Sequence, residues 1–392
     1  MKVLLVHARY ALPGGEEQVV DTQEATLTRL GHSVIRYEEP NADLDVTGVT
    51  AKARATGSAV WSRAARVRVA GLIASAAPDV VHVHNTFPRV SPSVYVAANA
   101  ARVPVVQHLH NARLVCIQPF LVRDGAPCDT CVGRLPLAGV VHRCYRQSLP
   151  QSAVAAGVQV THRAIGTWRR RVTRFVAVSE SLAETYRASG VVPGSKLVVC
   201  ENGLAVDPGR RDPSLDHGYA LFVGRLSYEK GVDTLIDAAG TLPDLRVVIA
   251  GDGPERGALE HAARDMANVV FTGQVDRARV SSLMRGARVL VAPSRGIEPF
   301  GLTVVEAAAM GVPAIVARSG ALADLVGEGA TGCVVAANDP PALRAALERM
   351  SAAEMAQPLG DAARAVFEQR FAPDAYGRRL VRLYDDVLAH AP

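Results

Sequence analysis

Residues 289–317 read VLVAPSRGIEPFGLTVVEAAAMGVPAIVA, two short apolar segments separated by a longer helical pattern. The β-branched runs Val289–Ala292 and Ala314–Ala317 predict strands, and Gly301–Met310 predicts a helix between them. A strand, a helix and a second strand in this order form one unit of a parallel sheet. The stretch therefore predicts an α/β fold in which helices cover a parallel sheet.

The same alternation continues through most of the chain. Similar apolar runs predict further strands at Val3–His7, Ser33–Tyr37, Asp79–Val83, Val103–Leu109, Phe175–Val178, Lys196–Cys200, Ala220–Gly224, Arg246–Ala250, Val269–Phe271 and Cys333–Val335. Two segments interrupt it: 112–150, which is rich in Cys, Pro and Gly, and the polar linker 202–217. We therefore predict two doubly wound, Rossmann-like domains, residues 1–205 and 206–372, which face an interdomain cleft, with a cysteine-rich insert in the first.

The composition is that of an ordinary globular protein: 392 residues, of which 49% are hydrophobic and 21% charged. These values exclude disordered and fibrous classes. The longest uncharged apolar stretch, Ala307–Ala317, has 11 residues, whereas a membrane-spanning helix needs about 20. The apolar run at Val3–Val6 is too short for a signal peptide. We expect a cytoplasmic protein, and peripheral association with the inner face of the membrane stays open.

Positive charge is concentrated in the first half of the chain. The net charge is +5, but residues 50–175 carry 17 basic and 3 acidic side chains. Such a field favours anionic partners: nucleotides, phospholipid head groups or phosphate-bearing acceptors. The alternative is that clusters such as 169–171 are simply solvated surface. Only 5% of residues are aromatic, so we expect no nucleic-acid partner.

Two glutamates, Glu298 and Glu306, flank the start of the helix predicted at Gly301. A helix start presents unpaired N–H groups and a partial positive charge, so it can hold a phosphate against the amides of Leu302 and Thr303. A fully helical span between the glutamates would be about 12 Å, close to the distance from the sugar to the ribose of a nucleotide sugar. Each carboxylate suits a vicinal diol. The alternative is one helix start with one exposed glutamate.

Glycines and cations follow other predicted strands. Arg225 and Lys230 lie on one strand-to-helix loop and could clamp a diphosphate, although a surface ion pair is the alternative. Gly14 and Gly15 open the first predicted helix and would let the backbone approach a ligand. Residues 251–254 (Gly-Asp-Gly-Pro) lack the third glycine of a dinucleotide fingerprint, which argues against NAD.

With these motifs the chain resembles, over most of its length, the retaining family-4 glycosyltransferases of the GT-B fold (glycosyl transferases group 1). The most specific matches are the E-x7-E motif Glu298–Glu306 and the pair Gly224-Arg225 with Lys230-Gly231. Weaker matches are Gly14-Gly15, Asp79–His84, Val178-Ser179 and Asn202-Gly203.

The resemblance implies that different residues of the site bind different parts of the donor. Glu298 would contact the donor sugar, Glu306 the ribose, and Arg225 and Lys230 the diphosphate. The implied donor-binding residues are Gly15, Gly224, Arg225, Lys230, Gly253, Val275, Glu298, Phe300, Gly301, Leu302, Thr303 and Glu306. Residues near Gly253 and Val275 would hold the nucleobase.

The N-terminal domain would supply the other half of the site. His110 matches the family's histidine near the transferring carbon, and Asn111 stands where the family usually has Asp. We expect Gly14, Glu16 and Asn111 to bind the acceptor. The family's closing helix, which crosses back to the N-terminal domain, matches Pro373–Leu388, so residues 373–392 form a third predicted segment.

The implied reaction is direct sugar transfer with retention of configuration and without a catalytic metal or cofactor. His110, Glu298, Arg225 and Lys230 are the expected catalytic residues. The two cations and the helix amides would stabilise the departing phosphate most strongly in the transition state. A UDP-hexose or UDP-N-acetylhexosamine is the favoured donor because the family commonly uses UDP. A glycan, a lipid-linked molecule or a small molecule remains open as acceptor, in glycan or glycosylated-metabolite biosynthesis.

Four of the six cysteines fall within residues 116–144. The spacing of Cys116, Cys128, Cys131 and Cys144 predicts a tetrahedral thiolate site for structural zinc. Free or redox-active thiols and an iron–sulfur cluster are the alternatives. The other two, Cys200 and Cys333, lie in apolar strands and are predicted to be core residues.

Other functions fit the same motifs less well. A GT-B epimerase or sugar phosphorylase is the nearest competitor. A glycoside hydrolase with two catalytic glutamates fits poorly, because both lie at one phosphate-type helix start. A non-enzymatic, zinc-stapled interaction scaffold is the third hypothesis.

Overall fold

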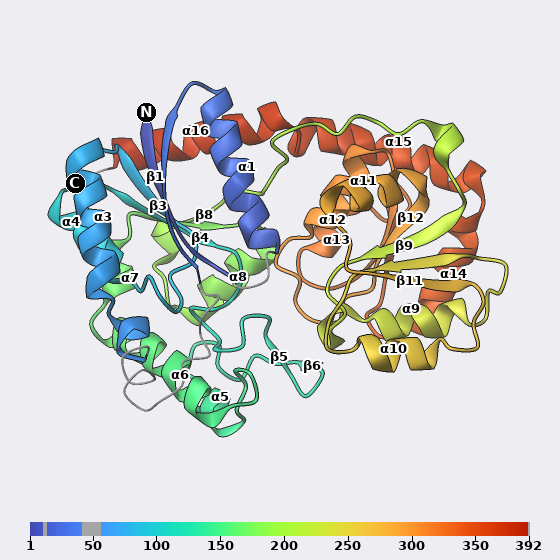
Figure 1. Cartoon of the computed structure of the whole chain (residues 1–392), viewed down its shortest axis with the longest axis horizontal. Coiled ribbons are helices and arrows are strands. Elements are labelled where there is room, and N and C mark those ends of the chain that lie inside the picture. Colours follow the sequence, from blue (N-terminus) through green and yellow to red (C-terminus); the bar gives the residue numbers. More distant parts are fainter. Residues whose placement is uncertain (11–13, 41–55, 391–392) are drawn as a thin grey trace. The chain divides into compact units, whose positions relative to one another are not determined.

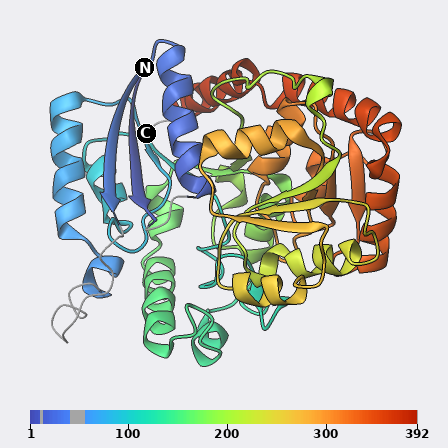
Figure 2. The same ribbon diagram turned by 45° about the vertical axis from the view of Figure 1, so that its right-hand side comes forward.

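The structure, a computed structural model, describes residues 1–10, 14–40 and 56–390. The chain divides into two compact units. The first comprises Met1–Leu121, Cys128–Ala205 and Tyr376–Pro392, and the second comprises Val122–Pro127 and Val206–Ala375. Figure 1 labels their elements, and Figure 2 shows them after a turn of 45°.

The first unit is built on a six-stranded parallel sheet in the order β2-β1-β3-β4-β7-β8. Its strands are β1 (Lys2–Arg9), β2 (Ser33–Pro40), β3 (Val80–Val83), β4 (Val105–Leu109), β7 (Arg174–Ala177) and β8 (Leu197–Val199). Its helices are α1 (Gly15–Arg29), α3 (Arg63–Ala76), α4 (Ser93–Ala100), α5 (Leu137–Val141), α6 (Leu149–Ala164), α7 (Thr167–Arg171), α8 (Glu180–Ser189) and α16 (Pro373–Ala389), whose first residues belong to the second unit.

The C-terminal helix α16 is part of the core of the first unit. Its residues Tyr376, Leu380 and Tyr384 are buried with Val20 and Leu27 of α1 against the sheet. Figure 1 shows α16 and α1 on one face of the sheet and α3 away from them. The last helix of the chain is thus buried against strands that come from its beginning.

The second unit repeats the design with the sheet order β11-β10-β9-β12-β13-β14, again all parallel. Its strands are β9 (Tyr219–Val223), β10 (Val247–Ala250), β11 (Val269–Gly273), β12 (Ala287–Ala292), β13 (Ala314–Ala317) and β14 (Gly332–Val335). Its helices are α9 (Val232–Ala239), α10 (Arg256–Ala262), α11 (Arg277–Gly286), α12 (Leu302–Ala309), α13 (Leu322–Leu325), α14 (Pro340–Ser351) and α15 (Ala353–Arg370). The antiparallel hairpin β5 (Val122–Arg123) and β6 (Ala126–Pro127) is grouped with this unit.

Helices cover both faces of this second sheet. Figure 1 shows α9, α10 and α14 on one face and α11, α12 and α13 on the other. The strands β10 and β13 are buried along their whole length, whereas the edge strand β11 is mostly half-buried. Burial on both faces explains why these strands are continuous apolar runs rather than alternating ones.

The predicted fold class, two doubly wound parallel α/β domains, is confirmed. Predicted and observed elements differ mainly at their ends: the helix predicted at Gly301–Met310 spans Leu302–Ala309, and the strand predicted at Ala314–Ala317 has those bounds. Within the part of the chain that the structure describes, no helix combines the length and apolar character needed to cross a membrane.

Candidate functional site

The predicted donor-binding residues of the second unit lie at one edge of its sheet. They follow four neighbouring strands: Arg225 after β9, Gly253 after β10, Val275 after β11, and Glu298 with Gly301 after β12. Because all these strands are parallel, their carboxyl ends meet at the same edge, where ligands of such sheets bind. The fold therefore gathers motifs that are far apart in the sequence.

An ion pair joins the two most specific motifs. The Nζ atom of Lys230 lies 2.6 Å from Oε2 of Glu298, and both side chains are partly exposed. Ser294 also donates to this carboxylate, at 3.4 Å. Backbone hydrogen bonds hold the two loops of this ion pair together, because the N–H groups of Arg295 and Gly296 donate to the carbonyl of Glu229, next to Lys230.

Close backbone packing explains two of the glycines. A Cβ at Gly251 would overlap the carbonyl of Gly224, and one at Gly253 would overlap the backbone of Leu226. The N–H of Leu226 donates to the carbonyl of Asp252 at 2.9 Å, so the loops after β9 and β10 are bonded together. The exposed guanidinium beside them, that of Arg225, has no carboxylate within 4 Å among the described residues.

The amino end of α12 is available for an anion. Gly301, with a φ of 112°, caps this helix and has no side chain over its first turn. Among the described residues, the N–H groups of Leu302 and Thr303 have no backbone partner, as expected for the first turn of a helix. Glu306 lies one turn further on, about a fifth exposed, with Nη2 of Arg277 3.9 Å from its Oε1. Phosphate binding at this helix start is therefore physically favourable.

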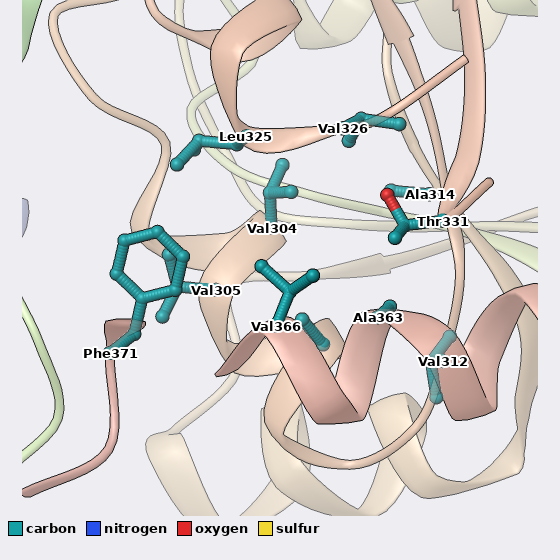
Figure 3. Close-up of a pocket in the computed structure, with 11 residues that line it drawn as sticks. Val304, Val305, Val312, Ala314, Leu325, Val326, Thr331, Ala363, Val366 and Phe371 are labelled. Atoms are coloured by element: carbon teal, nitrogen blue, oxygen red, sulfur yellow. The ribbon is translucent and has the colours of Figure 1, made fainter. Parts of the chain in front are cut away.

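Not every predicted donor residue offers its side chain to this edge. The ring of Phe300 is 5% exposed and packs edge-on against Phe371, with ring centroids 6.1 Å apart. Behind α12 lies an apolar pocket lined by Val304 and Val305 of α12 and Val366 of α15 (Figure 3). The opposite face of α12 is thus packed into the core, which holds the helix start in place.

In the first unit, the three predicted acceptor residues lie together. Gly14 caps α1, the helix that contains Glu16. The amide Nδ2 of Asn111 donates to Oε1 of Glu16 at 2.5 Å, and the hydroxyl of Tyr10 lies 3.3 Å from the same oxygen. Burial raises the pKa of Glu16, and nearby Arg113 opposes the rise. These contacts make a polar cluster at the start of α1.

His110 belongs to a histidine stack that sequence reasoning missed. The stack consists of His82 and His84 from the end of β3 with His108 and His110 from the end of β4. The rings of His108 and His110 lie 4.4 Å apart at 11°, and those of His84 and His110 lie 5.1 Å apart at 17°. His84 Nδ1 lies 2.9 Å from His110 Nε2. The signal was available: histidines at alternate positions of a strand point to the same face.

The inner end of the stack contacts two polar side chains from other elements. Nδ1 of His82 lies 2.8 Å from the hydroxyl of Tyr384 and 2.9 Å from the amide of Gln23, and Nε2 of His82 lies 3.1 Å from Nδ1 of His108. Burial lowers the pKa of His108 to about 3 and those of His82, His84 and His110 well below their usual value. The stack is therefore neutral at pH 7.

Among the described residues, three histidines of the stack form the one group whose metal-ligating atoms lie within 4.8 Å of one another: His82, His84 and His108. Their rings are nearly parallel, with an angle of 15° between His82 and His84. Nitrogen lone pairs lie in the ring plane, so stacked rings cannot aim them at one ion about 2 Å away. This arrangement suits packing rather than metal binding.

The four cysteines of the predicted zinc site form no disulfide, and within the described part of the chain they do not make up such a group. They are nevertheless neighbours. Burial raises the pKa of Cys116 to about 12, and the thiols of Cys131, Cys144 and Cys128 add to the rise. Cys131 is buried as well. The predicted core cysteines, Cys200 and Cys333, are 4% and 1% exposed.

Sequence reasoning also missed the loop after β13. A Cβ at Gly320, with a φ of 53°, would overlap the backbone of Glu298, and the N–H of Ala321 donates to the carbonyl of Glu298 at 2.9 Å. Ser319 donates to the carbonyl of Gly296. The Ser-Gly-Ala sequence after a strand was the available signal. This loop holds Glu298 at the sheet edge.

The two doubly wound units define the class of GT-B proteins, and comparison with known proteins identifies the family. Residues 210–366 match the model "Glycosyl transferases group 1", and residues 8–203 match "Glycosyl transferase 4-like domain". The chain belongs to the family-4 glycosyltransferases of the GT-B fold, and it is an enzyme of the transferase class. The scaffold hypothesis is thereby set aside.

Relatives and solved structures agree with this assignment. The chain is 30% identical, over 71% of its length and 70% of the relative's, to phosphatidyl-myo-inositol mannosyltransferase of Mycobacterium tuberculosis. It is 42% identical, over 31% of its length and 32% of the relative's, to a GDP-mannose-dependent phosphatidylinositol dimannoside mannosyltransferase of the same species. The crystal structure of Anabaena HepE in complex with UDP has the same fold, with a TM-score of 0.69 at 18% identity over 98% of this chain and 100% of that one.

Proposed function

We propose that this glycosyltransferase moves a hexose from a nucleoside diphosphate sugar to an acceptor hydroxyl with retention of configuration. The observation that carries the proposal is the Lys230–Glu298 pair at the amino end of α12. A cation, a carboxylate and a free helix start suit a diphosphate joined to a sugar diol.

The chemistry follows from where charge develops. As the bond between the sugar C1 and the phosphate oxygen breaks, negative charge grows on the departing diphosphate. Lys230, Arg225 and the first amides of α12 stabilise that charge, and Glu298 holds the sugar hydroxyls. The acceptor oxygen forms the new bond to C1, and its proton passes to an oxygen of the leaving phosphate. No catalytic metal enters this scheme.

His110 contributes from the first unit in this proposal. His84 and His108 hold its ring, and burial keeps its pKa low, so the imidazole is neutral. A neutral ring near the sugar can orient it without adding charge next to the developing cation. Glu16 and Asn111 would hold the acceptor hydroxyl through the carboxylate and amide that already contact each other.

Two donors deserve direct comparison. A UDP-hexose or UDP-N-acetylhexosamine is the donor that the sequence motifs favour, and the HepE complex contains UDP. GDP-mannose is the second candidate, because a relative is named as GDP-mannose-dependent. The mannosyltransferase relatives likewise make a lipid-linked acceptor, such as an inositol phospholipid, the first acceptor to test.

The test combines binding with product analysis. A donor at 100 times its dissociation constant should stabilise the protein by about 2.7 kcal/mol in a thermal-shift screen of UDP-, GDP-, dTDP- and ADP-sugars. NMR of the product with the stabilising donor should then show a new glycosidic bond with retained anomeric configuration. An altered donor sugar would indicate an epimerase, and stabilisation by none of these donors would refute the proposal.

We also propose that Cys116, Cys128, Cys131 and Cys144 hold one structural zinc ion. Support comes from their spacing in the sequence and from the position of Cys116, whose thiol interacts electrostatically with each of the other three. Zinc would draw the sulfur atoms closer together than they lie without it. Its role would be to fix the segment between β4 and α6, where the local hydrophobic core is small.

A further inference from the structure

The segment that contains α5 and the start of α6 exposes apolar side chains. Leu135, Leu137, Val141 and Leu149 are 53%, 61%, 73% and 49% exposed, four of the large hydrophobic residues that the described chain leaves in water. Leu137 and Val141 are one helical turn apart and so share a face of α5. The other face of the helix is packed against the protein, because Val140 contacts a small buried cluster that contains Ile117.

Basic side chains alternate with these apolar ones along the same segment. Arg134, His142, Arg143 and Arg146 are exposed in the same segment. Between residues 130 and 179 the chain has eight arginines and no Asp or Glu. We call the exposed residues Leu135, Leu137, Val141 and Leu149, with Arg134, Arg143 and Arg146, the basic–apolar patch.

The arginines of the patch differ from most arginines of the second unit. Arg256, Arg288, Arg344 and Arg364, for example, each pair with a carboxylate. Arg134, Arg143 and Arg146 have no carboxylate within 4 Å among the described residues. Their charge is therefore not neutralised within the fold and is available to an external anion.

We propose that the basic–apolar patch docks on the surface of an anionic phospholipid bilayer. Leucine and valine side chains on a short helix can enter the boundary between head groups and acyl chains, while arginines bind the phosphates above them. Figures 1 and 2 both show α5 beside α6 at an end of the first unit, away from its sheet.

The charge of the patch argues against a second copy of this chain as its partner, and its apolar side chains argue against an acidic protein. In a contact between two copies of this patch, each arginine would face arginines of the other copy, with no carboxylate on either side to pair them. An acidic protein could pair the arginines, but the four exposed aliphatic side chains among them match a surface that is apolar directly beneath its anionic layer. A bilayer has that structure everywhere.

Vesicle co-sedimentation with the full chain tests this docking without any need for turnover. We expect binding to vesicles of phosphatidylcholine with about a third phosphatidylglycerol, much less at high salt, and none to phosphatidylcholine alone. The R143Q/R146Q variant should bind about 25-fold more weakly, at about fivefold per arginine. The L137E/V141E variant should also lose binding.

Matched controls remove the same groups elsewhere. R246Q/R279Q takes two exposed arginine charges from the second unit that likewise have no carboxylate within 4 Å among the described residues. V206E changes an apolar residue that is 75% exposed there. Both should bind like the unaltered chain, and all variants should keep its melting temperature because the changed side chains are exposed. Equal sedimentation with the two kinds of vesicle, or full binding by the patch variants, would overturn the proposal. A dimer in light scattering that L137E/V141E dissociates would assign the surface to a second copy instead.

Discussion

The ammonium group of Lys230 lies 2.6 Å from the carboxylate of Glu298, although the residues are 68 positions apart in the chain. One follows β9 and the other follows β12, and these strands are neighbours in the sheet. The pair is only partly buried, so its own contribution to stability is small. The pair matters because it fixes the positions of both charged groups at the start of α12.

Removing the cation should slow the reaction strongly. We expect Lys230→Ala to lower kcat about 100- to 1,000-fold, because charge on the departing diphosphate loses its partner in the transition state. Steady-state kinetics with the donor found by thermal shift would measure this. Arg264→Ala, which removes an exposed cation from the same unit, should keep kcat, and an unchanged kcat in Lys230→Ala would contradict the assignment.

Removing the second glutamate should act on nucleotide binding. Glu306→Ala is expected to raise the dissociation constant for the nucleoside diphosphate about 10- to 100-fold, the effect of one charged hydrogen bond to a ribose diol. Turnover at ordinary donor concentrations should then nearly vanish. Calorimetry measures the binding, with Glu348→Ala on α14 as the control. Equal affinity in both variants would place the ribose elsewhere.

His110→Ala should distinguish the contribution of the first unit to turnover from that of the second unit to nucleotide binding. We expect kcat to fall about 100-fold, as for loss of a group that positions the reacting sugar, while nucleotide affinity stays the same. All the predicted donor-binding residues except Gly15 belong to the second unit, which this change does not touch. His261→Ala is a matched change on α10. A loss of nucleotide affinity equal to the loss of kcat would contradict this division.

Acid should destabilise the first unit through the histidine stack. The pKa of His108 is about 3 in the folded chain and about 6.5 when unfolded, so the unfolded state binds more protons between these values. The stabilisation is complete above pH 6.5 and is lost as the pH falls below it. At pH 5, His108 alone should cost about 2 kcal/mol. Urea unfolding between pH 7.5 and 5 measures this, and stability that does not fall would show that folding leaves the pKa of His108 unlowered.

Zinc should copurify with the reduced protein. Metal analysis after purification without chelator is expected to find one zinc per chain, and Cys131→Ser should lose it while Cys333→Ser keeps it. Removal of the metal with a strong chelator should lower the melting temperature, since zinc binding stabilises the folded segment. Absence of zinc from the unaltered chain, or absorption typical of an iron–sulfur cluster, would rule the site out.

Much of the fold could be predicted because both sheets are buried on two faces. Apolar runs such as Ala314–Ala317 then identify strands directly, and a glycine before Leu302 marks a helix start. The cysteine segment could not be predicted in this way. Its hairpin Val122–Pro127 and the short helix α5 depend on local turns rather than on a repeating apolar pattern.

By itself, the sequence determined the parallel α/β architecture and the set of residues that could bind a nucleotide sugar, because periodicity and short motifs are local properties. Only the tertiary structure decided which of these residues meet. Strand order placed Lys230 against Glu298, and the register of β3 and β4 stacked His84 on His110. Packing also buried Phe300 away from the sheet edge. Strand order, register and burial arise from contacts between distant segments, and no local pattern encodes them.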